Sequence, residues 1–196
     1  EMAAQSPEWR GAAWFQLGRL ALSDQRLETA YHYAKRAMTA YGDDAQAVQL
    51  AAVVARVAGD LTAANAHLAR LLGLDPLNHV ARVERAMASG ATADRDAVVT
   101  GVTNEMPHET FLEMAAWYSN LGRPGDAAWL LALSPVTPEV LYWRAWLLRE
   151  ADAAASRALL AQASAGSPAL TFPFRAESVP VFRWAMAQSD AWQPRY

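Results

Sequence analysis

Apolar residues recur along most of the chain at spacings of three, four and seven residues, the pattern of helices that bury one face. Good helix formers fill these runs, chiefly Ala, Leu, Arg, Gln and Glu. Alternating runs of β-branched residues, which would indicate strands, are nearly absent. The pattern predicts an all-α chain whose helices, about 10–15 residues long, are joined by short loops and pack as antiparallel neighbours.

Gly, Pro, Asp and Ser interrupt the pattern at regular places, and one interruption lies within residues 53–76, VVARVAGDLTAANAHLARLLGLDP. Gly59 suits the positive φ at which helices often end. Asp60 can cap the following helix by accepting a backbone N–H, and Pro76 stops that helix or starts the next. We interpret the interruption as the turn of a helical hairpin whose helices cross at the small residue Ala64.

The hairpin recurs with a period of 34 residues when residues 11–44 are laid over residues 45–78. Apolar and small residues coincide in both helices of the two blocks. The matched pairs are Trp14 and Val48, Leu17 and Ala51, Gly18 and Ala52, Ala30 and Ala64, Ala34 and Leu68, and Ala37 and Leu71. This period, the Trp-x2-Leu-Gly motif of the first helix and the closing Pro resemble the tetratricopeptide repeat (TPR) family.

Looser hairpins are expected over residues 79–107, 108–135 and 138–168, followed by a terminal helix over residues 178–189. Within the third hairpin, the second helix is expected over residues 94–106. The TPR resemblance implies a right-handed superhelical solenoid of about five degenerate hairpins plus the final helix, spanning residues 1–196 as one domain.

The TPR resemblance also implies where a partner binds, because the concave groove of such arrays is lined by the first helix of each hairpin. The corresponding positions form a mixed surface of apolar, aromatic and Arg side chains, which are common anchors at interfaces. The candidate groove residues are Phe15, Arg19, Gln49, Val53, Arg56, Met87, Leu112, Tyr142, Trp146 and Arg149. The alternative is that many of them simply pack on neighbouring helices.

One TPR subfamily grips the C-terminal carboxylate of chaperones with a Lys, Asn, Asn, Lys, Arg clamp. At those offsets this chain carries Phe15, Arg19, Leu50, Val80 and Glu84. The clamp is missing, so a chaperone-tail receptor is not expected.

A second resemblance covers the C-terminal half, where the segment Phe172-Pro173-Phe174-Arg175 precedes a Trp-bearing helix. This half resembles the repeat region of large bacterial proteins in which a galactose-mutarotase-like β-sandwich domain precedes TPR hairpins. The resemblance implies that any catalysis would lie in an upstream sugar-binding or sugar-processing domain, and that the present chain is a fragment of a longer protein.

Composition narrows the classes of partner and compartment. The formal net charge is −3 and Lys35 is the only lysine, which disfavours binding to nucleic acid. No run of about 18 apolar residues occurs, so a membrane span is not expected. The N-terminus lacks the apolar segment of a signal peptide, and the chain has no Cys, which excludes disulfides and thiolate sites. We therefore expect a cytoplasmic protein.

Candidate chemistry is sparse. The four histidines show no metal-ligand spacing, and we expect surface or capping roles for His32, His67, His79 and His108. The acidic pairs are expected at helix ends or exposed turns, where capping and solvation explain them: Asp43 and Asp44, Glu84, Asp94 and Asp96, Glu150 and Asp152. No nucleophile elbow or phosphate-binding glycine loop occurs. We expect neither a cofactor nor catalysis in this segment.

The sequence thus predicts a scaffold that binds a peptide or protein partner through the concave surface. The alternative is an accessory or dimerisation module of a larger carbohydrate-active bacterial enzyme, packed on an N-terminal domain of the same chain or on a second copy. A self-assembling array is a third possibility. The fold alone does not decide between them.

Overall fold

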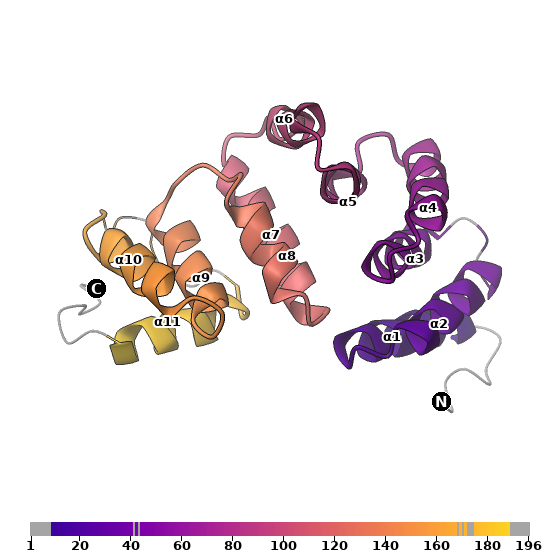
Figure 1. The fold of residues 1–196 in the computed structure, drawn as a ribbon, viewed down its shortest axis with the longest axis horizontal. Helices are drawn as coiled ribbons and strands as arrows, with labels where there is room; N and C mark the ends of the chain where they lie inside the picture. Colours follow the sequence, from indigo (N-terminus) through magenta and orange to yellow (C-terminus); the bar gives the residue numbers. More distant parts are fainter. Residues whose placement is uncertain are drawn as a thin grey trace. The chain divides into compact units, whose positions relative to one another are not determined.

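A computed structural model describes residues 9–40, 42, 44–167, 169, 171 and 175–188. These residues form eleven α-helices and no strand, which confirms the all-α prediction (Figure 1). None of the described helices has the length and apolar character needed to cross a bilayer. The chain divides into two compact units, Glu1–Val102 and Thr103–Tyr196. One continuous solenoid over both units stays a prediction.

The first unit contains three helical hairpins. Its helices are α1 (Arg10–Ser23), α2 (Leu27–Ala40), α3 (Ala45–Val57), α4 (Leu61–Leu74), α5 (His79–Ser89) and α6 (Thr92–Gly101). Within each hairpin the two helices pack together, and the first helices also contact one another in turn, α1 with α3 and α3 with α5 (Figure 1). Leu61 begins α4 34 residues after Leu27 begins α2, so the expected repeat period is confirmed here.

The predicted turn chemistry is also confirmed. Gly59 adopts φ 82°, and Asp60 caps α4 by accepting the N–H of Ala63 at 2.9 Å. In the third hairpin α6 begins and ends earlier than expected, at Thr92 and Gly101 rather than over residues 94–106. Gly101 has a low helix propensity, which accounts for the early end.

Helices of the first unit approach closely because small residues lie where they meet. A Cβ at Gly18 would lie 2.9 Å from Cδ2 of Leu50 on α3, inside normal contact distance. Ala30 and Ala34 of α2 and Ala64 of α4 are fully buried. The core of this unit is therefore built mainly from Ala, Val and Leu, which pack at close helix spacing.

A buried ion pair links the first helices of the second and third hairpins. Arg56 of α3 donates from Nε and Nη2 to the two carboxylate oxygens of Glu84 on α5, at 2.6 and 3.0 Å. The Glu84 side chain is 1% exposed. The expectation that Glu84 lies at a helix end or exposed turn is therefore wrong, because Glu84 lies within α5 and is buried. Its charge can be buried because Arg56 supplies the compensating charge.

The second unit contains two hairpins and a final helix. Its helices are α7 (Pro107–Asn120), α8 (Pro124–Leu131), α9 (Pro138–Leu148), α10 (Ala153–Ser164) and α11 (Ser178–Gln188). α7 packs on α8, α8 on α9, and α9 on both α10 and α11 (Figure 1). The large side chains of Phe111, Tyr118, Tyr142 and Trp143 are each at most 1% exposed, so aromatic rings replace much of the Ala-rich packing of the first unit.

Polar contacts fix the start of α11 against α7 and α9. Ser178 donates from Oγ to Oε1 of Glu139 at 3.0 Å, and Trp143 donates from Nε1 to the same Oγ at 3.0 Å. Just before α11, Arg175 pairs with Glu109 of α7 at 2.5 Å. Glu139 is 3% exposed although it lies in the first turn of α9.

This environment changes the acidity of Glu139. Burial raises the pKa of its carboxyl group to about 7, against the opposing effect of the Ser178 hydrogen bond. The Glu109 carboxylate adds to the rise in pKa, and the Arg175 guanidinium opposes it. The folded protein therefore keeps a proton on Glu139 that the unfolded chain releases, so the free energy of unfolding depends on pH up to about neutrality.

We predict that Glu84→Ala strongly destabilises the first unit. Removing one partner of a buried pair leaves the other charge uncompensated, a loss of about 3–5 kcal/mol. The double variant Arg56→Met, Glu84→Leu should recover most of that free energy, because neither charge is then left behind. Urea unfolding of the single and double variants measures both. Equal stability of Glu84→Ala and the unmodified protein would show that the ion pair contributes nothing to the free energy of unfolding.

We predict that Glu139→Gln reduces the pH dependence of stability. An ordinary Glu releases its proton near pH 4.5, whereas folded Glu139 keeps it to about pH 7. The folded state thus binds more protons between these values, and stability falls as pH rises through them. Gln is neutral at every pH. At pH 8 the free energy of unfolding of the variant should therefore exceed that of the unmodified protein by up to about 3 kcal/mol.

The difference should shrink at pH 5, and urea unfolding at the two pH values measures it. Glu113→Gln is the matched control, because Glu113 is an exposed Glu on α7. Parallel pH profiles for Glu139→Gln and the unmodified protein would contradict the prediction.

Candidate functional site

In the first unit, two of the predicted groove residues lie together on α1. The guanidinium carbon of Arg19 is 5.8 Å from the ring centroid of Phe15, and Nη1 of Arg19 donates to Gln16 at 3.2 Å. Both side chains are half-buried, as are Gln49 of α3 and Met87 of α5. These four residues have side-chain surface available to a partner.

In the second unit, the structure brings together Trp146 and Arg149 near the end of α9. The guanidinium carbon of Arg149 lies 4.4 Å from the centroid of the Trp146 ring, and Nη1 donates to the Trp146 carbonyl at 2.5 Å. The Trp146 ring meets the buried ring of Trp143 edge-on at 5.7 Å. Trp146 is thus braced from within while it remains half-exposed.

The remaining four candidates require correction. Val53, Leu112 and Tyr142 are 0%, 1% and 1% exposed, so they belong to the core and present no surface to a partner. Tyr142 packs on Phe182 of α11, with ring centroids 5.4 Å apart. Arg56 is engaged with Glu84 and does not serve as a free cation for a partner carboxylate. Three of these side chains are covered by neighbouring parts of the fold, and the charge of the fourth, Arg56, is neutralised by Glu84 of α5.

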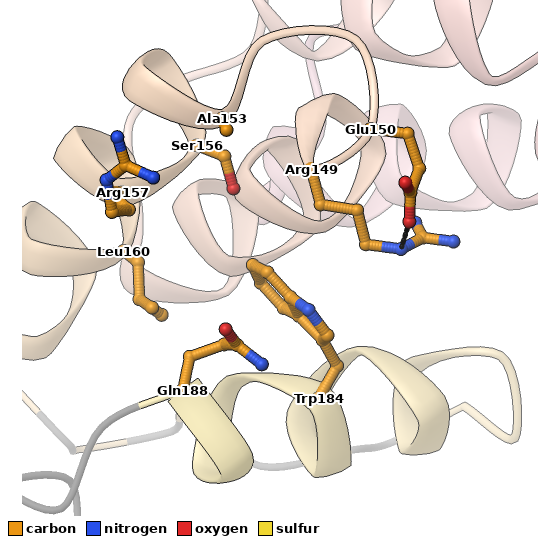
Figure 2. Close-up of a pocket in the computed structure, with 8 residues that line it drawn as sticks. All are labelled: Arg149, Glu150, Ala153, Ser156, Arg157, Leu160, Trp184 and Gln188. Carbon is orange, nitrogen blue, oxygen red and sulfur yellow. Dashed lines mark ion pairs between the residues drawn. The ribbon is translucent and has the colours of Figure 1, made fainter.

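A pocket of about 290 Å³ lies in the second unit, between the α9–α10 hairpin and α11 (Figure 2). Its lining residues are Arg149, Glu150, Ala153, Ser156, Arg157, Leu160, Trp184 and Gln188. In Figure 2, Trp184 extends from α11 toward the hairpin and stands between Arg149 on one side and Arg157 on the other. The pocket is therefore lined by one indole and by two arginine side chains at its opposite ends, with the Arg149 guanidinium directed toward Glu150.

Several lining residues have defined partners. Ser156 donates from Oγ to the Ala145 carbonyl at 2.7 Å, which ties α10 to α9. Arg149 and Glu150 form an ion pair at 3.6 Å, and the Glu150 side chain is 86% exposed. Asp152 caps α10 by accepting the N–H of Ala155 at 2.9 Å. The Ser156 hydrogen bond and the Asp152 cap fix the position and the start of α10, so this wall of the pocket is part of a regular helix.

Of the eight residues that line the pocket, only Arg149 is among the sequence-based candidates. The polar and aromatic residues Arg157, Trp184 and Gln188 are among those that were missed. They lie on α10, which is the second helix of its hairpin, and on the terminal helix α11, whereas the candidates came only from the first helices of hairpins. In the sequence, Arg157 and Trp184 are visible as a cation and an aromatic residue in two consecutive helices. Only the packing of α11 beside α10 places them in one pocket.

Polar contacts are described for His67 and His108, and the surface and capping roles expected of the four histidines stay predictions. His67 of α4 lies 3.2 Å from the Tyr31 hydroxyl, and Nε2 of His108 lies 3.4 Å from Glu109. Burial lowers the pKa of His67, with further lowering by Arg70 and Lys35. Among the described residues, no three His, Asp or Glu side chains are arranged to hold a metal ion.

Residues 172–174, which carry most of the second resemblance, lie outside the described residues, and so does Asp43. The link to a galactose-mutarotase-like domain therefore stays a prediction.

No protein-family model matches the sequence, and no curated protein matches it. Solved structures with a similar fold include TTC0263, a thermophilic TPR protein in Thermus thermophilus, at 16% identity and a TM-score of 0.48 over 90% of this chain and 99% of that one. PilF of Pseudomonas aeruginosa is similar at 16% identity and a TM-score of 0.47, over 91% of each chain. MamA protein is similar at 12% identity and a TM-score of 0.42, also over 91% of each chain. Similarities at this level assign neither a partner nor an activity.

Proposed function

We propose that this chain is a protein-interaction scaffold that binds a peptide or protein partner through half-exposed aromatic and cationic side chains of its hairpins. The observation that carries the proposal is the Trp146–Arg149 pair, held at 4.4 Å beside the pocket of the second unit. Trp and Arg are the residue types that most often dominate binding energy at interfaces.

Preorganisation supports this role for Trp146 and Arg149. The Arg149 guanidinium is oriented by the Trp146 ring and carbonyl, and the Trp146 ring rests on buried Trp143. Side chains held in one geometry before binding lose less conformational entropy when a partner arrives. Half-exposed rings on rigid helices therefore give more net affinity than mobile surface residues.

Phe15 and Arg19 form a comparable cation–aromatic pair in the first unit, although at a longer separation of 5.8 Å. The Nε of Arg19 is buried and makes no hydrogen bond within the described part of the chain. The accessible part of the Arg19 side chain is therefore the outer part of its guanidinium group, beside the half-buried Phe15 ring. The absence of catalysis and the cytoplasmic location stay predictions.

We predict that Phe15→Ala combined with Trp146→Ala weakens capture of the native partner. Truncating an interface anchor commonly removes about 2 kcal/mol or more, which corresponds to at least about thirtyfold in affinity. Quantitative pull-down from the native lysate measures the loss, and far-UV circular dichroism confirms that the helices persist.

Trp9→Ala combined with Leu77→Ala is the matched control, because both side chains are large, apolar and exposed, at 63% and 73%. The control should capture the partner as the unmodified chain does. Unchanged capture by the Phe15 and Trp146 double variant would show that this surface is not used.

A further inference from the structure

We infer that the pocket between α10 and α11 accepts an acidic residue of a peptide, with an apolar residue beside it in that peptide packing on Trp184. The inference rests on the proposed scaffold function and specifies the chemistry of the segment that is bound. It follows from the two guanidinium groups, the indole face and the size of one cavity in the second unit.

The two cations are available to an incoming carboxylate. Arg157 is exposed and forms no ion pair with any residue that the structure describes. Arg149 pairs only loosely with Glu150, at 3.6 Å, and exposed pairs of this kind contribute about 1 kcal/mol or less. A peptide carboxylate can displace Glu150 at little cost and form charge-assisted hydrogen bonds with a guanidinium.

The other residues that line the pocket determine which peptide residue can lie beside the acidic one. Trp184 is half-buried and, together with Leu160 and Ala153, presents apolar surface inside the pocket. The Ser156 hydroxyl is already committed to the Ala145 carbonyl, so the Gln188 amide is the uncharged polar side chain left to meet a ligand. An aliphatic or aromatic residue next to the acidic one satisfies this arrangement.

Size and charge favour a peptide over a polyanion. A cavity of about 290 Å³ lies at the lower end of ligand pockets, which suits one or two side chains. Glu150 lines the pocket and pairs with Arg149, and Asp152 caps α10, the helix that carries Arg157. A run of phosphates would be repelled by these carboxylates, whereas a single acidic residue can avoid them.

The probe is a phage-displayed random dodecapeptide library, panned against the immobilised 196-residue chain. We expect enrichment of Asp or Glu next to Leu, Phe or Trp. One enriched peptide is then synthesised with a fluorescent label and titrated by anisotropy. Arg157→Glu should weaken its binding at least about tenfold, and Trp184→Ala should weaken it similarly. Replacing the acidic residue of the peptide by Lys should restore binding to Arg157→Glu.

Arg183→Glu is the matched control, because Arg183 is an exposed Arg of α11 outside the pocket lining and the change in charge is the same. It should leave affinity within about twofold, since surface charges beyond the contact are screened. Circular dichroism establishes that each variant is folded, and Arg157→Gln provides a milder test if Arg157→Glu is not.

Each outcome decides a different statement. Enriched peptides that lack acidic residues, or that bind Arg157→Glu and Trp184→Ala as tightly as the unmodified chain, overturn the pocket inference and leave the scaffold proposal standing. Displacement of the peptide by a single-stranded oligonucleotide, with loss of oligonucleotide binding in Arg157→Glu, assigns the pocket to polyanions and also overturns the inference. Failure to enrich any peptide, together with unchanged capture in the pull-down, overturns both proposals.

Discussion

A helical hairpin with one apolar face cannot bury that face by itself, so each hairpin here depends on how closely its neighbour can approach. In the first unit, small residues set this distance. Gly18 lies so near Leu50 that even a Cβ would meet its side chain at 2.9 Å, and alanines fill the layer between α1, α2 and α3. Between α3 and α5 the contact is polar instead, and Arg56 and Glu84 form a bidentate pair that joins the second hairpin to the third.

The second unit satisfies the same requirement with large side chains. Trp143, Tyr142 and Phe182 occupy the space between α9 and α11, and the indole N–H of Trp143 needs a hydrogen-bond acceptor in that core. Ser178 supplies it and donates to Glu139 in turn. Glu139 is thus buried beside this aromatic layer, and burial raises the pKa of its carboxyl group.

Aromatic packing also connects the core to the proposed binding surface. Trp143 braces Trp146 from the interior, and Trp146 orients Arg149 at the edge of the pocket. Because the braced side chains belong to regular helices, a bound peptide would not need to order them. The Ser156 hydrogen bond to α9 keeps α10, and with it Arg157, at a defined position opposite Trp184. The packing of this unit and its proposed recognition surface therefore share the same layer of indole rings.

The sequence by itself determined the helical class, the 34-residue period of the first hairpins, and the cap and turn at Gly59 and Asp60, because helix periodicity and capping depend on residues a few positions apart. It also selected Phe15, Arg19, Trp146 and Arg149 as candidates, and the contacts within each pair follow from their spacing of about one helical turn. Only the tertiary structure decided that Val53, Leu112 and Tyr142 are core and that Arg56 is neutralised by Glu84. Only it joined Arg157 to Trp184, because burial and pocket formation depend on which helix covers a face, and that helix lies far away in sequence.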